Sequence, residues 1–121
     1  MNAGGLTEAK KIAAQAEAEH VSFAPHNPQG PVATAICVHA DATIPNFMIQ
    51  ELFQTYDVDW VEDLLVEPIA VEDGYVEIPD GPGLGIELDI DVVREHEYTE
   101  EGVHTINLFE QGWETRSLAD E

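Results

Sequence analysis

Apolar side chains near the start of the chain recur with a helical period. They fall at i, i+3, i+4 and i+7, at positions Ala9, Ile12, Ala13 and Ala16. This spacing predicts a helix with one narrow apolar face of mostly small side chains, suited to close packing against a sheet. Thr7 precedes that face and is predicted to cap the helix, with Glu8 in the first turn, where the helix dipole favours an anion.

Two short apolar runs follow, with a longer apolar segment between them. Residues 21–24 and 47–49 are each predicted to form a short buried strand, and Pro25 ends the first. The segment 32–42 is apolar almost all round and follows Pro31, which suits a first helical position. It is predicted to be a buried helix, although its length alone leaves a strand open.

The second half of the chain is dominated by turn signals. Residues 69–72 and 75–78 flank Asp73-Gly74, a strong hairpin signal, after an irregular stretch with a helical turn at 52–68. Residues 79–85, rich in Pro and Gly, are predicted to be a loop of tight turns. Their glycines lack the G-x-G-x-x-G spacing, so no dinucleotide site is expected there. Asp89 or Asp91 is predicted to cap a short helix ending at His96, and residues 106–121 to be loosely ordered.

The charge of the chain restricts its partners. It has 121 residues, 44% of them hydrophobic, and 25 acids against 4 Lys and Arg, a net charge of −21. This predicts one domain at most, with an acidic surface of the kind halophiles use, and argues against nucleic acid and membranes as partners. No signal peptide and no apolar run near membrane-spanning length opens the chain, so a cytoplasmic location is expected. The single cysteine, Cys37, lies in an apolar segment and is predicted to be a buried structural thiol.

Two residues directly after the predicted strands could move a proton. His26 lies in a rigid setting between Pro25 and Asn27-Pro28, where an imidazole can act as a general base near neutral pH. Glu51 follows the second strand and could hydrogen-bond to a substrate carboxylate or its enolate. A surface histidine and a solvated acid are the alternatives, and composition alone favours them.

The other histidines are predicted to have no part in the chemistry. His39 is expected to be packed on its helix, and no ligand pattern surrounds the rest, which are His20, His96 and His104.

Several motifs, in order along the chain, resemble one enzyme group. They are Asn2-Ala3-Gly4-Gly5-Leu6-Thr7-Glu8, Lys11-Ile12-Ala13, Phe23-Ala24-Pro25-His26-Asn27-Pro28-Gln29-Gly30-Pro31, the segment from Asn46 to Glu51, and the stretch from Asp73-Gly74 through Pro82-Gly83-Leu84-Gly85-Ile86. Together they resemble the C-terminal part of the mandelate racemase and muconate lactonizing group of the enolase superfamily. The resemblance is to its sugar-acid dehydratases in particular, of the galactonate dehydratase type.

The resemblance implies a fold and a division of the chain into two segments. The expected fold class is α/β, the C-terminal fragment of a (β/α)-barrel with a small hairpin-containing segment. Residues 1–55 would be the barrel remnant, from helix 6 to strand 8. Residues 56–121 would return to the capping domain, with a loose acidic tail. The open remnant is expected to leave strand edges and apolar surface exposed.

The resemblance also implies roles. His26 corresponds to the base that takes the proton next to the substrate carboxylate, and Glu51 to the glutamate that stabilises the enolate-like transition state. The family's Mg²⁺ is held by three acids, on strands expected to precede Met1. The aspartate that pairs with the histidine is also expected to precede Met1. The chain alone is therefore expected to hold no metal site and to be close to inert, because the metal absorbs the developing charge.

Three interpretations of function follow. The first is a piece of a sugar-acid dehydratase, either a truncated gene product or one half of a split enzyme. In the latter case an N-terminal partner polypeptide supplies the missing strands that are needed to act on a sugar acid. The second is a non-catalytic acidic remnant that acts as an interaction protein, including by self-association. The third is an independent α+β binding module. They are ranked in that order.

Overall fold

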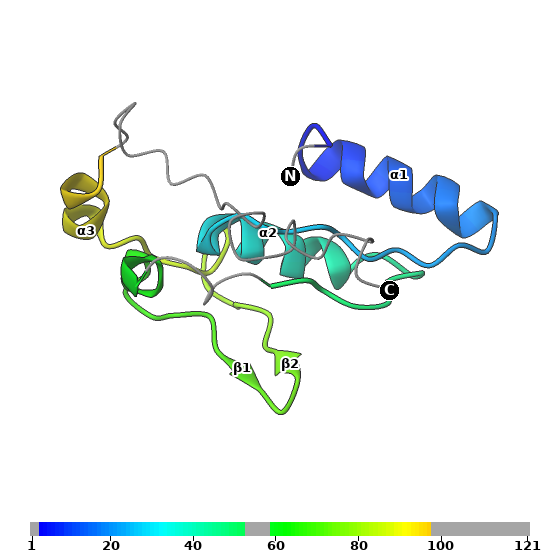
Figure 1. Ribbon diagram of the computed structural model, residues 1–121. Coiled ribbons are helices and arrows are strands. Elements are labelled where there is room, and N and C mark those ends of the chain that lie inside the picture. The colour runs from blue at the N-terminus through cyan, green and yellow to red at the C-terminus, as the bar shows by residue number, and fades with distance from the viewer. Residues whose placement is uncertain (1–2, 53–58, 98–121) are drawn as a thin grey trace, which may run out of the picture.

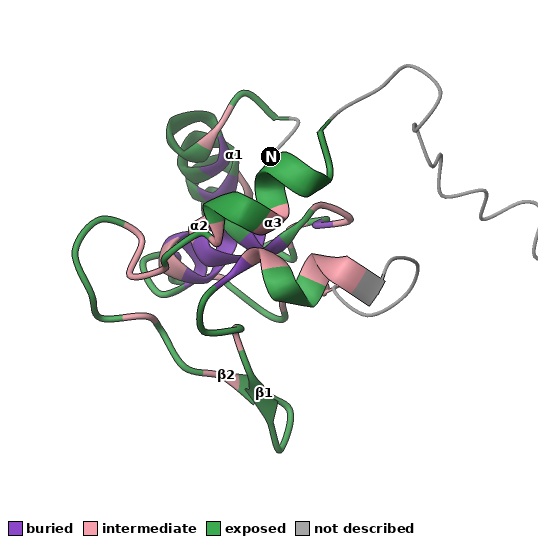
Figure 2. Ribbon diagram, turned by 90° about the vertical axis from the view of Figure 1, so that its left-hand side faces the viewer, coloured by how far each residue is buried: buried purple, intermediate pink, exposed green. Residues whose placement is uncertain are grey.

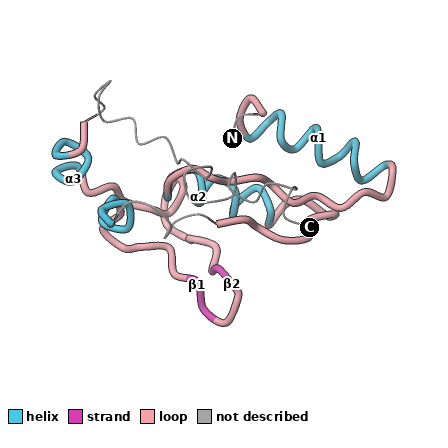
Figure 3. Tube along the Cα trace, in the orientation of Figure 1, coloured by secondary structure: helices cyan, strands magenta, loops and turns pink. Residues whose placement is uncertain are grey.

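The computed structural model describes residues 3–52 and 59–97. Within them the elements are helices α1 (Leu6–Ala18) and α2 (Pro31–Asp41), the 3-10 helix η1 (Asp59–Leu64), strands β1 (Val71–Glu72) and β2 (Tyr75–Val76), and helix α3 (Ile90–Glu95). Figure 1 shows α2 in the middle of the view, with extended segments running beside it, α1 on one side and α3 at the opposite end. Loops make up much of the rest, as Figure 3 shows.

Helix α1 begins before the position that a threonine cap would give it. Its N-cap is Gly5, with φ 89° and no side-chain hydrogen bond, so the predicted Thr7 cap is wrong. Gly4 and Gly5 both have positive φ, which residues with side chains rarely adopt, and the Ala9 N–H already donates to the Gly5 carbonyl at 3.1 Å. Thr7 therefore lies inside the first turn. The glycine pair, rather than a hydroxyl, turns the chain into the helix.

The apolar face of α1 is narrower than predicted. Ala9 and Ala13 are buried and Ala16 is partly buried, but Ile12 is 47% exposed. Small side chains allow α1 to approach α2 closely, and Ala13 packs with Ala40, Ile44 and Phe23 in the core. Figure 2 shows the buried residues gathered on α1, α2 and the segments beside them.

The two predicted strands meet at a single point. Phe23 and Phe47 form an isolated parallel bridge, in which the Phe23 N–H donates to Asn46 O at 2.8 Å and the Met48 N–H to Phe23 O at 2.9 Å. The predicted strands 21–24 and 47–49 are therefore wrong as regular strands. Parallel strands are normally stabilised by neighbours on both sides, and the described residues supply only one pairing here.

Helix α2 confirms the predicted buried helix. Pro31 occupies the first turn, and the buried apolar side chains are Ala35, Cys37, Val38 and Ala40. Cys37 is 1% exposed, as predicted, and burial, with a contribution from Asp41, raises the pKa of its thiol. A thiol in this state is a poor nucleophile at neutral pH, which agrees with a structural role.

The second half confirms the predicted hairpin and the short helix. Strands β1 and β2 pair antiparallel, Val71 with Val76 and Glu72 with Tyr75, around Asp73-Gly74. Asp89, rather than Asp91, caps α3, because its carboxylate accepts from the N–H groups of Asp91 and Val92. An isolated antiparallel bridge between Leu65 and Leu88 joins the two ends of this half.

Some predictions fall outside the described residues. These are the domain boundary at residue 55 and the loose tail at 106–121. In the part of the chain that is described, no helix is long and apolar enough to cross a membrane.

Candidate functional site

The structure brings His26 and Glu51 into contact. His26 Nδ1 lies within hydrogen-bond distance of Glu51 Oε2, although 25 positions separate the residues. The Phe23–Phe47 bridge explains this contact. His26 lies three positions after Phe23 and Glu51 four positions after Phe47, on segments that run parallel. The two side chains are 71% and 40% exposed, so a ligand could reach the pair from solvent.

The Glu51 carboxylate has a second contact from the protein backbone. The Asn27 N–H donates to Glu51 Oε2 at 2.9 Å. The neighbouring Gln50 ties the two segments together, because its Nε2 donates to Glu51 O at 2.6 Å and to Pro25 O at 3.5 Å. One carboxylate oxygen therefore faces both the imidazole and a backbone donor, an arrangement that holds it in a defined position.

Asn27 links this pair to helix α2. Its side chain is fully buried, and its Nδ2 donates to Thr34 Oγ1 at 3.0 Å. Thr34 is also fully buried and lies in the first turn of α2. Sequence reasoning did not single out Asn27 or Thr34. The available signal was a polar Thr inside an otherwise apolar segment, which predicts a specific hydrogen-bond partner.

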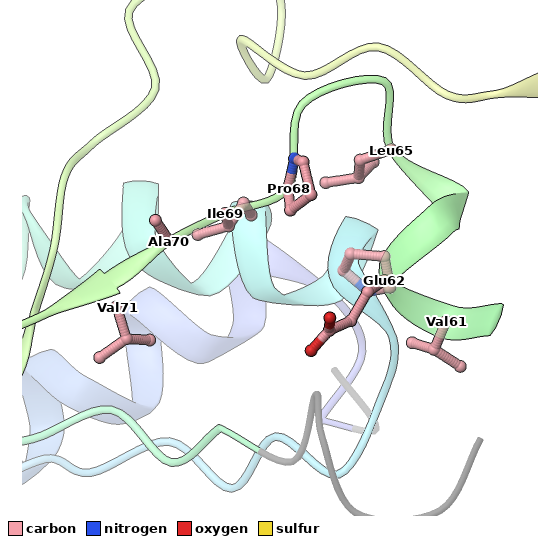
Figure 4. A pocket seen from close by; sticks show the side chains of 8 residues that line it. Val61, Glu62, Leu65, Pro68, Ile69, Ala70 and Val71 are labelled. Atoms are coloured by element: carbon pink, nitrogen blue, oxygen red, sulfur yellow. The ribbon is translucent and has the colours of Figure 1, made fainter. Parts of the chain in front are cut away.

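A shallow hollow adjoins the imidazole. It measures about 270 Å³, and its lining includes His26 with Phe23, Ala24 and Pro25, and Ala9 and Ile12 of α1. A separate pocket of about 340 Å³ lies between Pro31 of α2 and residues 61–71, with Glu62 among apolar side chains (Figure 4). Neither His26 nor Glu51 lines that pocket, so it is not part of the candidate site.

The other histidines in the described part of the chain have different surroundings. His39 is partly buried, as predicted, and its Nε2 is 3.1 Å from the Leu84 carbonyl. His20 is exposed in the turn after α1, with φ 59°, and the His96 ring stacks on Trp60 with centroids 4.1 Å apart. His104 lies outside the described residues.

The described residues do not form a metal centre. Across residues 3–52 and 59–97, no three His, Cys, Asp or Glu side chains come together in a way that could hold an ion. The Mg²⁺ implied by the resemblance therefore does not fit this set of donors, and its ligands stay a prediction about other segments.

Asp41 is the most perturbed acid in the described part of the chain. It lies at the end of α2, is 8% exposed, and neither carboxylate oxygen has a hydrogen-bond partner among the described residues. Burial raises its pKa to about 7. It lines an apolar groove of about 590 Å³ between α2, residues 47–52 and the β1–β2 hairpin.

Comparison with known proteins assigns the family. The chain belongs to the family described as "Enolase C-terminal domain-like", which matches residues 1–92. D-xylonate dehydratase of Haloferax volcanii is 39% identical over 93 residues, covering 77% of this chain and 22% of that protein. D-galactonate dehydratase of Xanthomonas campestris is 43% identical over 100 residues, covering 77% and 26%. The chain thus spans about a quarter of the length of these relatives.

Solved structures agree with this assignment. A mandelate racemase/muconate lactonizing enzyme-like protein from Rubrobacter xylanophilus superposes with a TM-score of 0.71 at 38% identity, over 79% of this chain and 24% of that one. A mandelate racemase/muconate lactonizing enzyme from Sulfitobacter superposes at 0.70 and 40% identity, over 82% and 24%. These findings confirm the resemblance inferred from the motifs.

Proposed function

We propose that His26 and Glu51 form part of the active site of a sugar-acid dehydratase, and that the chain supplies the last strands and helices of its (β/α)-barrel. The observation that carries the proposal is the contact between the two side chains, just beyond a pair of parallel segments. Barrel enzymes place their chemistry at the carboxyl ends of such strands. The relatives named as sugar-acid dehydratases support the substrate class.

The proposed reaction removes water from a hydroxy acid. His26 takes the proton from the carbon next to the substrate carboxylate. The hydroxyl on the adjacent carbon then leaves as hydroxide, and the proton taken up by His26 balances it as water. The resulting enol rearranges to a 2-keto-3-deoxy acid. Glu51 hydrogen-bonds to the enolate as charge develops, which stabilises the transition state more than the bound substrate.

The remaining parts of the site come from another segment in this proposal. Enzymes of this superfamily typically use Mg²⁺, which would polarise the substrate carboxylate, but the described residues offer no set of donors for it. We propose that an N-terminal segment or partner polypeptide carries the metal ligands and the other strands. Without it, turnover by this chain is expected to be very low.

An exposed apolar surface favours such a partner, and it also supports a second candidate function. Phe47, Met48 and Ile49 are 37%, 70% and 62% exposed, although they belong to the segment that leads to Glu51. Apolar residues in this number and position are usually covered by another element. A non-catalytic interaction protein, assembled through this surface or by self-association, is the alternative.

The test is to restore the missing segments. The chain would be co-produced with the N-terminal three-quarters of the Haloferax volcanii enzyme, and 2-keto acid formation measured with D-xylonate and D-galactonate. His26→Asn should lower kcat by about 100- to 10,000-fold, because the proton loses its acceptor. Glu51→Gln should lower kcat by about 100-fold with a smaller change in KM.

Matched variants separate chemistry from folding. His20→Asn changes an exposed histidine outside the site and should leave turnover unchanged, whereas His39→Asn should chiefly lower stability by removing the contact with Leu84 O. Full activity in His26→Asn would refute the proposed base. A stable complex without any turnover would favour the interaction protein instead.

A further inference from the structure

Two hydrogen bonds, both made by Asn27, connect helix α2 to the Glu51 carboxylate. Thr34 Oγ1 accepts from Asn27 Nδ2 at 3.0 Å, and the Asn27 backbone N–H donates to Glu51 Oε2 at 2.9 Å. We propose that Asn27 and Thr34 are positioning residues, which hold the Glu51 carboxylate against His26 by anchoring the Asn27 backbone to α2. The inference adds to the proposed function and rests on it only for the catalytic roles of His26 and Glu51.

The burial of Asn27 favours a specific role over packing. The residue is fully buried, yet its Oδ1 has no hydrogen-bond partner in the described structure. A buried amide with one unsatisfied end costs free energy that an apolar side chain of similar size would not. The compensating contact is the one with Thr34, which is itself fully buried.

The surrounding backbone makes the anchor effective. The backbone on both sides of Asn27 is restricted by the fixed φ angles of Pro25, Pro28 and Pro31. Pro31 is the first residue of α2, and Thr34 completes the first turn of that helix. Thr34 Oγ1 also lies 3.5 Å from the Gly30 carbonyl, which closes the short connection onto the helix. The side-chain bond to α2 adds a further restraint on Asn27, and so on the direction of its backbone N–H.

The consequence for chemistry is preorganisation. Glu51 is partly exposed and, like any carboxylate, could turn toward water. Its Oε2 instead meets a backbone donor and the imidazole of His26 together. A donor that is already fixed costs no reorganisation when charge develops, which is how oriented backbone N–H groups contribute to catalysis.

The experiment uses the full chain and needs no turnover. Thr34→Val removes the hydroxyl with little change in shape. We expect amide hydrogen exchange at Asn27 to accelerate about tenfold, which corresponds to losing roughly one hydrogen bond. The Nδ1 nitrogen resonance of His26 should shift as its contact with Glu51 loosens. Thr34→Ser keeps the hydroxyl and should restore both signals.

Thr43→Val is the matched control. Thr43 makes a hydroxyl contact with Ala40 O at 2.8 Å near the opposite end of α2, so its loss tests general loosening of the helix. It should leave Asn27 exchange and the His26 resonance unchanged. Equal effects of Thr34→Val and Thr43→Val, or no effect of Thr34→Val, would overturn the proposal.

A further variant covers misfolding. If Thr34→Val does not fold, Asn27→Ala is used, because it keeps the backbone N–H while losing the side-chain anchor. The same faster exchange and resonance shift are expected, and their absence would again overturn the proposal. An inactive restored enzyme with these signals intact would count against the dehydratase function and not against the anchor.

Discussion

Residues 3–52 and residues 59–97 differ in how many of their apolar side chains are buried. The first region packs small side chains between α1 and α2, and its buried apolar residues are Ala9, Ala13, Ala35, Cys37, Val38, Ala40 and Ile44. Among the described residues of the second region only Leu65 is buried to this degree, while large side chains such as Tyr75 and Ile78 are 79% and 51% exposed.

The second region is held together by other means. Backbone bonds join Val66 N to Glu87 O at 2.9 Å and Asp89 N to Leu64 O at 3.0 Å, and His96 stacks on Trp60. The comparison teaches that the candidate site lies on the packed region, whereas the region after it depends on turns and backbone pairing. Truncating a buried side chain of the first region should therefore be costly, whereas truncating an exposed side chain of the second region should be mild.

The largest expected effect comes from truncating the core. Ile44 is 6% exposed and packs with Ala13, Ala40 and Phe23, so Ile44→Ala should lower the free energy of unfolding by about 2–5 kcal/mol. Ile78→Ala, in the second region, should change it by less than about 0.5 kcal/mol. Urea unfolding followed by circular dichroism measures both. Similar losses for the two variants would contradict the contrast between the regions.

An intermediate effect is expected at Asp41, a buried acid whose charged form destabilises the packed region. Its folded pKa of about 7 lies above the ordinary aspartate value of 3.8, so the folded state disfavours the charged form. The neutral Asp41 carboxyl makes its full contribution to the free energy of unfolding below pH 3.8. This contribution falls as the pH rises and is lost above about pH 7. Cys37 is the other buried titratable group beside it, and its raised pKa keeps the thiol neutral in this range.

Asp41→Asn should remove this pH dependence. At pH 8 the variant should be more stable than the parent by about 1–3 kcal/mol, because no unpaired charge is buried, and near pH 4 the two should be alike. Asp63→Asn removes one charge from an exposed position and serves as the control. Thermal unfolding across pH 4–8 tests the sign. A parent that gains stability with rising pH relative to Asp41→Asn would show that the carboxylate has a partner.

Local signals explain which parts of the fold the sequence predicts. Pro31 at the start of α2, the Asp73-Gly74 turn and the Asp89 cap act over a few residues, so their chemistry can be read directly from the chain. The strands could not be delimited, because the length of a parallel strand depends on neighbours elsewhere in the fold. The Thr7 cap failed because two glycines with positive φ begin the helix first.

The site was predicted in part for the same reason. His26 and Glu51 stood out as proton-moving groups after apolar runs, and the structure places them together, although their catalytic roles stay a prediction. The Asn27 contacts could not be predicted, because one partner lies 24 positions away and the other depends on how α2 begins. Spacing along a chain carries no information about which buried polar groups meet.

A smaller effect than at Ile44 or Asp41 should come from the hairpin turn, where backbone geometry rather than packing holds the second region. Asp73 and Gly74 have φ values of 51° and 82°, the left-handed pair that a two-residue hairpin needs. Gly74→Ala should cost about 1 kcal/mol, because a side chain disfavours this conformation even though an added Cβ would meet open space beyond its chain neighbours. The cross-strand NMR contacts between Val71 and Val76 should weaken.

Gly30 provides the matched control from the packed region. A methyl group at Gly30 would also meet open space, but the φ of −69° is available to any residue, so Gly30→Ala should be close to neutral. The two glycines thus differ in backbone conformation and not in crowding. If both substitutions prove neutral, the hairpin is held by its side chains after all. The two regions would then be stabilised in the same way, contrary to the contrast in their burial.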